Sequence, residues 1–189
     1  SPSVTMTAAG ERGIGAATAE ALAHAGAHVI LTGRSTGGLE EVEQHVHAAG
    51  GSATIAPLDL TEGDSISRLA EAVTGRWKKL DILVMNAAML GTLSPVPHID
   101  AKEFDRLVTL NLVANQRLLA AFDPMLRQGT APRIVAVTAS VATAIRPYFG
   151  AYGASKAALE CLVLTYGEEV KNLGDIRVAI VDPGATATT

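Results

Sequence analysis

Short apolar runs recur along the chain, with longer segments of mixed polarity between them. The runs are rich in β-branched residues, and neither face shows a regular polar alternation, which is typical of strands that are covered on both faces. They predict strands at residues 27–32, 52–57, 82–85, 134–138 and 178–181. The longer segments predict helices at residues 16–25, 39–49, 64–77, 101–127 and 155–172.

The strict alternation of predicted strands and helices indicates the fold class. Strand–helix–strand units form right-handed crossovers, and their repetition builds a parallel sheet with helices on both faces. We therefore predict an α/β fold, a doubly wound parallel sheet of the Rossmann-like type, as one domain over residues 1–189.

Both ends of the chain are unusual for such a sheet. Only residues 4–7, half of them threonine, are available for a first central strand. After the last predicted strand, Asp182-Pro183-Gly184 and five further residues follow. A doubly wound sheet usually continues, so we expect the C-terminal part of the fold to be missing from this sequence.

Composition narrows the range of partners. The chain has 189 residues, of which 48% are hydrophobic, so it can bury a substantial core. Its net charge of −4 without a basic block argues against nucleic acid and membrane surfaces, and no apolar run is long enough to cross a bilayer. The single cysteine, Cys161, excludes an internal disulfide and a cysteine-based zinc site. We expect a cytoplasmic protein without a metal, whose partners are small molecules or other subunits.

A glycine-rich turn follows the first predicted strand and opens a helix. It reads Gly10-Glu11-Arg12-Gly13-Ile14-Gly15. Glycines allow the backbone to approach a pyrophosphate, and the unpaired amides of a helix N-terminus meet its charge. A flexible turn is the alternative, but the position at the head of a strand–helix–strand unit favours dinucleotide binding.

Arg34 follows the second predicted strand, where the adenosine ribose of a dinucleotide would lie. An acidic residue there would bind a free 2′-hydroxyl, whereas a guanidinium pairs with a 2′-phosphate. The chain has no acid at this position, and Arg12 lies in the adjacent turn. Two ordinary surface arginines are the alternative, yet their joint placement favours NADP(H) over NAD(H).

Tyr152 and Lys156 are four residues apart in the segment YGASK, which would put them one turn apart on a helix face. An isolated phenol titrates near pH ~10, and a neighbouring ammonium favours its ionised form. Such a pair can pass protons in both directions. The same spacing also occurs on solvated helix faces, so its context has to support this interpretation.

That context is an ordered series of short motifs. Beyond the glycine-rich turn and the Tyr–Lys pair, it comprises Asp59-Leu60, Asn86-Ala87-Ala88, Asn111, Ser140, and Pro183-Gly184 with Thr188. The motifs span nearly the whole chain. In their order and identity, the sequence resembles the short-chain dehydrogenase/reductase family.

The resemblance implies an enzyme that interconverts a carbonyl and a secondary alcohol. Tyr152 would be the acid in reduction and the base in oxidation, and Lys156 would lower its pKa and bind the nicotinamide ribose. Ser140 would polarise the substrate oxygen, and Asn111 would hold a water that links Lys156 to solvent. These roles are physically sensible because the cofactor carries the hydride while the protein supplies orientation and a proton.

The resemblance also implies a cofactor site. Asp59 would contact the adenine, Asn86 and its neighbours would line the cofactor, and residues 183–188 would hold the nicotinamide end. The complete set of expected cofactor-binding residues is Gly10, Arg12, Gly13, Ile14, Gly15, Arg34, Asp59, Leu60, Asn86, Ala87, Ala88, Tyr152, Lys156, Pro183, Gly184, Thr186 and Thr188.

Several of these residues have a purely structural alternative. Asp59 could cap a turn or helix, and Asn86 could tie neighbouring strands together. Asn111 could be a buried residue whose amide is satisfied by backbone groups. Ser140 could be a turn residue, with Thr138 as the nearest other hydroxyl.

The sequence departs from the family pattern at three places. Ala8 and Ala9 stand where the usual T-G-x-x-x-G-x-G turn has its threonine and first glycine, and Gly10 could substitute after a one-residue shift. Asn86-Ala87-Ala88 replaces the commoner N-A-G. The loop between Ser140 and the tyrosine is one residue shorter than is usual.

Two functional hypotheses remain. The first is an NADP(H)-dependent oxidoreductase for a small, partly apolar carbonyl or alcohol, because the loops at residues 89–99 and 142–150 supply apolar walls. The second is a non-catalytic nucleotide-binding sensor or scaffold that kept the fold while its glycine-rich turn decayed. The resemblance further implies a homodimer or homotetramer that pairs through the helices at 101–127 and 155–172.

Overall fold

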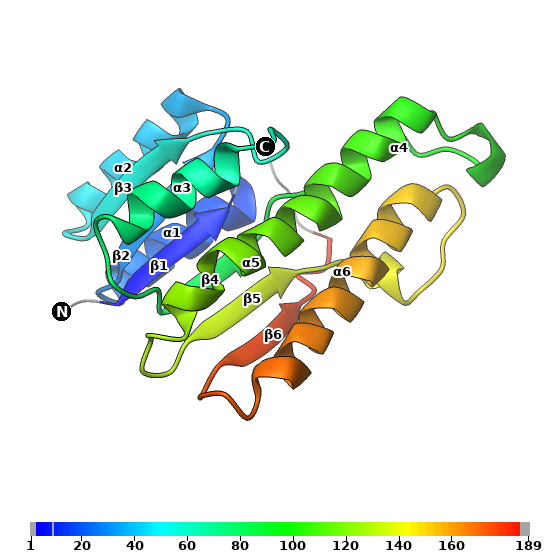
Figure 1. Ribbon diagram of the computed structural model, residues 1–189. Coiled ribbons are helices and arrows are strands. Elements are labelled where there is room, and N and C mark those ends of the chain that lie inside the picture. Colours follow the sequence, from blue (N-terminus) through cyan, green and yellow to red (C-terminus); the bar gives the residue numbers. More distant parts are fainter. Residues whose placement is uncertain (1–2, 9, 186–189) are drawn as a thin grey trace.

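Six parallel strands form one sheet in the computed structural model, which describes residues 3–8 and 10–185 (Figure 1). The strands are β1 (Val4–Ala8), β2 (His28–Gly33), β3 (Ser52–Pro57), β4 (Ile82–Met85), β5 (Arg133–Val137) and β6 (Arg177–Val181). Their order across the sheet is β3-β2-β1-β4-β5-β6. The predicted α/β fold class is therefore confirmed.

Helices connect the strands. They are α1 (Gly13–His24), α2 (Thr36–Ala48), α3 (Ser65–Thr74), α4 (Ala101–Val108), α5 (Ala114–Leu126) and α6 (Gly150–Val170). Short 3₁₀ turns, η1 (Val96–His98) and η3 (Ser140–Ala142), and a π-helical turn, η2 (Thr109–Val113), complete the described elements. Among the residues that the structure describes, none of the helices combines the length and the apolar character needed to cross a bilayer.

The strand order reverses direction at β1. From β1 the chain proceeds outward through β2 and β3, then returns to place β4 on the other side of β1. Loops leaving the carboxyl ends of β1 and β4 therefore run to opposite sides and leave a crevice between them, which is where open α/β sheets bind ligands.

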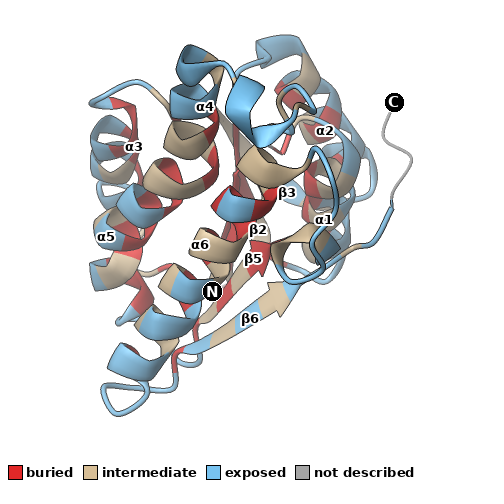
Figure 2. Ribbon diagram, turned by 90° about the vertical axis from the view of Figure 1, so that its right-hand side faces the viewer, coloured by how far each residue is buried: buried red, intermediate tan, exposed pale blue. Residues whose placement is uncertain are grey.

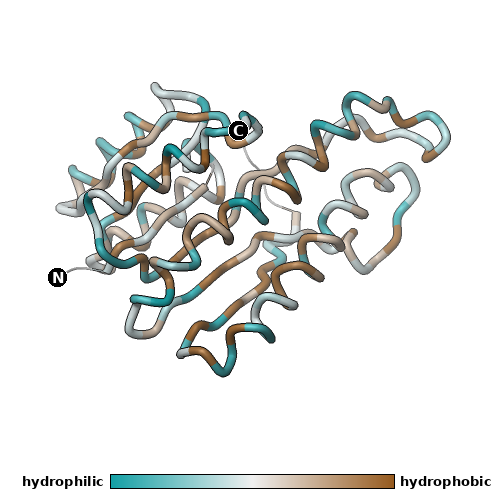
Figure 3. Tube along the Cα trace, viewed as in Figure 1, coloured by the Kyte–Doolittle hydropathy of each residue, from teal (hydrophilic) through white to brown (hydrophobic). Residues whose placement is uncertain are grey.

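Two hydrophobic layers sandwich the sheet (Figures 2 and 3). One face of β2 packs with α1 and α2, in a cluster that includes Ala19, Leu31 and Val42. The other layer joins α3, α5 and α6 to β1, β4 and β5, and Phe122 of α5 is fully buried in it. The central strand β1 is buried along its whole length in spite of its threonines, so the expected first strand exists and extends to Ala8.

Helix α2 and helix α4 begin at side-chain caps. The hydroxyl of Ser35 accepts a hydrogen bond from the amide of Gly38, and the carboxylate of Asp100 accepts one from the amide of Glu103. These caps satisfy amide groups that the first turn of a helix leaves unpaired. The predicted helix at 101–127 corresponds to α4, η2 and α5 in succession, with the π-helical turn in its middle.

Strand β6 differs from the prediction that each strand is covered on both faces. Val178 and Ile180 are partly buried, and Val178 packs near Gly167 of α6, but the alternate residues Arg177, Ala179 and Val181 are exposed. The layer of α1 and α2 does not reach this edge in the described chain.

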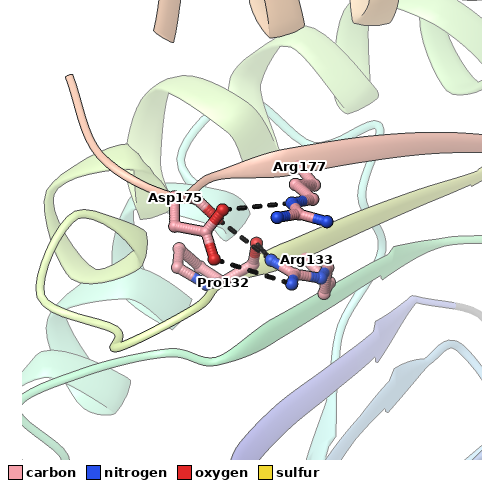
Figure 4. A network of polar contacts seen from close by, with 4 residues as sticks. All are labelled: Pro132, Arg133, Asp175 and Arg177. Atoms are coloured by element: carbon pink, nitrogen blue, oxygen red, sulfur yellow. Dashed lines mark hydrogen bonds and ion pairs between the residues drawn. The ribbon is translucent and has the colours of Figure 1, made fainter. Parts of the chain in front are cut away.

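A polar network joins β5 and β6 at their amino ends, opposite to the crevice (Figure 4). The guanidinium of Arg133 donates to the carbonyl oxygens of Pro132 and Asp175, both at 3.0 Å, and Arg177 donates to the Asp175 carboxylate at 3.0 Å. The charged groups are largely exposed, so the network aligns the two strands and contributes little to stability.

Candidate active site

The glycine-rich turn lies against the end of β2. The amide of Gly10 donates a 3.0 Å hydrogen bond to the carbonyl oxygen of Thr32, and a Cβ at Gly10 would stand 2.9 Å from Leu31 Cδ2. Helix α1 then begins at Gly13, whose φ of 57° favours glycine, and Arg12 supplies no side-chain cap. The N-terminal amides of α1 thus remain available to an anionic ligand.

A pocket of about 660 Å³ opens beside this turn, over the carboxyl ends of β1, β2, β3 and β4. Nine of the expected cofactor-binding residues line it: Arg12, Gly13, Ile14, Arg34, Asp59, Leu60, Asn86, Ala87 and Ala88. The topology brings these residues together from four separate segments of the chain. Both arginines are exposed, which leaves their guanidinium groups free to move toward a ligand.

Asp59 is engaged within its own turn. Its Oδ1 accepts hydrogen bonds from the hydroxyl of Thr61 at 2.7 Å and from the amide of Thr61 at 2.8 Å. These bonds are the main reason why the pKa of Asp59 is lowered, with a further contribution from the charge of Arg34. Helix α3 begins at Ser65 after Asp64, so Asp59 caps the turn and not the helix.

Tyr152 and Lys156 lie in the first two turns of α6, on the other side of the crevice. The Nζ of Lys156 is 5.7 Å from the centre of the Tyr152 ring and donates a 2.8 Å hydrogen bond to the carbonyl oxygen of Val137. Lys156 is only 2% exposed. Loss of solvent lowers its pKa to about 8.

The pKa of Tyr152 is raised, whereas the sequence predicted that Lys156 would lower it. Burial of the phenol is the main cause, because the phenolate loses hydration, and the negative charge of Asp182 after β6 raises the pKa further. The predicted lowering rested on the charge of the neighbouring Lys156 alone. Burial of the phenol and the carboxylate of Asp182 depend on the tertiary structure, so they cannot be predicted from the spacing of Tyr152 and Lys156.

Asn111 joins the loop after β4 to α6. Its side chain accepts a hydrogen bond from the amide of Met89 at 2.8 Å and donates to the Met89 carbonyl oxygen at 2.9 Å. Its Nδ2 also donates to the hydroxyl of Ser155 at 3.0 Å, and that hydroxyl donates to the carbonyl oxygen of Tyr152. The side chain of Asn111 therefore bonds to backbone groups, as its structural alternative requires, and also to the hydroxyl of Ser155. These bonds hold Tyr152 in register with the pocket wall at Met89.

Ser140 is exposed at the start of η3, directly after β5. Its carbonyl oxygen accepts hydrogen bonds from the amides of Thr143 and Ala144, so it shapes the turn while its hydroxyl is on the surface. The neighbouring Val141 packs against α6 at Gly153, where an added Cβ would stand 2.8 Å from the Val141 carbonyl oxygen. This glycine permits the close approach that brings the Ser140 turn beside the helix of Tyr152.

Comparison with known proteins identifies the family. A family model described as short chain dehydrogenase matches residues 3–189. This chain belongs to the short-chain dehydrogenase/reductase family.

Relatives and solved structures agree with this assignment. An uncharacterized oxidoreductase of Mycobacterium tuberculosis is 36% identical over 163 residues, which cover 84% of this chain and 48% of the relative. The short-chain dehydrogenase/reductase FrzI of a Cladobotryum species is 32% identical, with 95% of this chain and 69% of that protein covered. This chain therefore spans about half the length of the mycobacterial relative.

Several similar solved structures carry NADP or NADPH. A metagenomic short-chain oxidoreductase in complex with NADP has a TM-score of 0.91 and 34% identity, covering 98% of this chain and 83% of its own. A protein from Shigella flexneri complexed with NADP has a TM-score of 0.94 and 28% identity, and the match covers 99% of this chain and 79% of that protein's chain.

Not every expected dinucleotide-binding residue lines the pocket. Gly10 and Gly15 belong to the turn without lining it, and Tyr152 and Lys156 lie on α6 outside it. Pro183 and Gly184 follow β6, with the Gly184 amide donating to the Asp182 carboxylate at 2.9 Å. Thr186 and Thr188, like Ala9, lie outside the described residues.

Part of the pocket was not predicted from the sequence. The further lining residues are Glu11, Gly33, Leu58, Thr61, Met89, Arg106 and Leu110. Six of them adjoin a predicted residue, Leu110 through its neighbour Asn111, and could have been found by extending each motif by one position. Arg106 could not, because it lies in α4, five residues before Asn111, and only the fold brings it to the pocket.

Proposed function

We propose that the protein is an oxidoreductase that interconverts a carbonyl and a secondary alcohol with NADP(H). One observation carries the proposal: a half-buried tyrosine and a buried lysine share the start of α6, beside the Ser140 turn and at the same sheet end as the pocket at the glycine-rich turn. The substrate class is a small, partly apolar carbonyl or alcohol, in keeping with the apolar residues of the neighbouring loops.

The pocket residues fit a dinucleotide. The free amides at the start of α1 suit a pyrophosphate, and Gly13, whose positive φ favours glycine, lines the pocket at that point. Arg12 and Arg34 suit a 2′-phosphate, and solved relatives are complexed with NADP or NADPH. When bound, the nicotinamide supplies or accepts the hydride.

The residues of α6 supply the remaining chemistry. In reduction, the Tyr152 hydroxyl gives its proton to the substrate oxygen, and in oxidation the phenolate takes it back. The Ser140 hydroxyl orients and polarises that oxygen. Lys156 places a positive charge beside the ring of Tyr152, and Asn111 keeps this part of α6 in register with the loop after β4.

A cofactor titration tests the proposal directly. We expect NADPH to bind the full-length protein, and Arg34→Ala to weaken that binding by about 10- to 100-fold, because a charge-assisted pair with the 2′-phosphate is lost. NADH affinity should change by less than about threefold. Arg68→Ala, an exposed arginine of α3 outside the pocket, is the matched control. Failure of the full-length protein to bind either dinucleotide would contradict the proposal.

We further propose that two copies of the chain pair through α5 and α6. A largely apolar groove of about 720 Å³ runs between these helices, lined by residues such as Leu119, Leu162 and Leu173. Such a face suits a self-complementary two-fold contact, as a homodimer or within a homotetramer.

Leu162→Arg tests this pairing. We expect the variant to shift the assembly toward monomer in light scattering after size-exclusion chromatography, because an unpaired charge would be buried in the contact. Val96→Arg places the same charge on an exposed residue outside the groove and should leave the mass unchanged. A monomeric parent protein, or an assembly unaffected by Leu162→Arg, would refute the pairing through these helices.

A further inference from the structure

Glu11 occupies an unusual place in the glycine-rich turn. Its carboxylate lies directly over Gly33, the last residue of β2, so that a Cβ built on Gly33 would stand 1.3 Å from Glu11 Oε2. A Cβ built on Gly38, in the first turn of α2, would likewise stand 3.1 Å from the Cβ of Glu11 and 3.2 Å from its carbonyl oxygen. Two glycines therefore make room for this one side chain, which is half-buried and lines the pocket.

The Oε2 of Glu11 is buried and has no hydrogen-bond partner. In the described part of the chain, the other buried side-chain oxygens without a partner are three threonine hydroxyls and one amide oxygen. Glu11 Oε2 is the carboxylate oxygen in this group. A buried anionic oxygen without a donor is costly. Glu11 also lines the pocket, so a rotation of its side chain away from Gly33 brings a carboxylate oxygen within reach of a ligand hydroxyl, which then supplies the missing donor.

The position of Glu11 determines which part of a dinucleotide it would meet. The carboxyl end of the second strand of a dinucleotide-binding unit faces the adenosine ribose. A carboxylate there accepts a hydrogen bond from a free 2′-hydroxyl and repels a 2′-phosphate. The adjacent Arg12 and Arg34 have the opposite preference, since their exposed guanidinium groups attract the phosphate.

We infer that Glu11 is a specificity-determining residue that opposes the 2′-phosphate and limits the preference of the pocket for NADP(H) over NAD(H). This inference rests on the proposed function and deepens it. The arginines attract the 2′-phosphate of NADP(H), and Glu11 repels it and favours the free 2′-hydroxyl of NAD(H). The chain therefore binds both dinucleotides. Neutralising Glu11 leaves the two arginines unopposed and shifts the balance toward NADP(H).

Isothermal titration of the full-length protein tests the inference without a turnover assay. The ligands are NADP⁺ and NAD⁺, together with 2′,5′-ADP and 5′-AMP, which carry and lack the 2′-phosphate without the nicotinamide. We expect Glu11→Gln to tighten binding of NADP⁺ and 2′,5′-ADP by about tenfold, because a repulsive charge is removed. Binding of NAD⁺ and 5′-AMP should be unchanged or a few-fold weaker. The effect should shrink at high salt.

Two further variants complete the design. Glu11→Ser removes the carboxylate together with its bulk and should also shift the ratio of NADP⁺ to NAD⁺ affinity toward NADP⁺. Agreement of the two variants shows that the shift does not come from a folding defect caused by glutamine. Glu71→Gln, on an exposed face of α3, removes the same charge away from the pocket and should leave the ratio unchanged.

The outcomes separate the inference from the proposed function. If the parent binds dinucleotides but both Glu11 variants keep the NADP⁺ to NAD⁺ affinity ratio within about twofold of its value, the inference is overturned and the proposed function stands. If neither the parent nor the variants bind any of the four ligands, the proposed function is overturned and the inference with it. A ratio shifted toward NADP⁺ in both Glu11 variants, and not in Glu71→Gln, supports the inference.

Discussion

Replacement of Tyr152 by phenylalanine is expected to lower kcat for carbonyl reduction by roughly 10²- to 10⁴-fold, the usual contribution of a positioned general acid. The ring of Tyr152 is kept and its proton is lost, while dinucleotide affinity should stay within about threefold. The raised pKa keeps the phenol protonated at neutral pH, which suits reduction. Alcohol oxidation requires the phenolate, so its rate should rise with pH in the parent protein and lose that dependence in the variant.

Tyr166→Phe is the matched control for this substitution. Tyr166 lies on the same helix, where its hydroxyl donates a 2.7 Å hydrogen bond to Asp123, distant from the Ser140 turn. We expect unchanged kcat and a stability loss of about 1 kcal/mol, typical of one hydrogen bond. Steady-state kinetics over a panel of carbonyl compounds provides the measurement. Full reductase activity in Tyr152→Phe would remove the tyrosine from the mechanism, and a parent that binds dinucleotide without any turnover would favour the sensor hypothesis.

Replacement of Lys156 by methionine is expected to abolish activity and to change how stability depends on pH. Burial lowers the pKa of Lys156 from 10.5 to about 8, so at neutral pH the folded protein carries an ammonium that burial destabilises by roughly 3 kcal/mol. Methionine fills a similar volume without a charge. The variant also loses the hydrogen bond from Lys156 to the Val137 carbonyl oxygen, which offsets about 1 kcal/mol of the stability gained by removing the buried charge.

The sign of the pH dependence follows from proton binding. Between the folded and unfolded pKa values of Lys156, the unfolded chain binds a proton that the folded chain does not, so the free energy of unfolding of the parent rises with pH across this window. Lys156→Met lacks this contribution. Its stability advantage over the parent should therefore be largest below about pH 8 and decline toward about pH 10.5.

Urea denaturation of both proteins at several pH values measures this difference. Lys171→Met, at the exposed C-terminal end of α6, removes a lysine that is not buried and should follow the pH profile of the parent. Parallel stability profiles for the parent and Lys156→Met would show that the ammonium is not destabilised by burial. Retained activity in Lys156→Met would show that its charge is not needed.

The sequence predicted much of the candidate site because its residues follow strands. In a parallel sheet all carboxyl ends lie at one edge, so Arg12, Arg34, Asp59 and Asn86 had to meet once the strands were recognised. The spacing of Tyr152 and Lys156 likewise placed them on successive turns of one helix. Periodicity and chain order are sufficient for such conclusions.

Other features depended on contacts between distant segments. Burial and the charge of Asp182 raise the pKa of Tyr152, and the Val137 carbonyl oxygen receives the ammonium of Lys156. Asn111 could be interpreted as a water-binding or a backbone-binding residue until its bonds to Met89 were known.

By itself, the sequence determined the α/β class, the order of the strands along the chain and the family, since hydrophobic periodicity and short motifs are local properties. Only the tertiary structure decided the electrostatic environment of each group and the meeting of Glu11 with Gly33. Solvent exposure and the distance between charges depend on segments far apart in the chain, and the pattern around a residue does not contain them.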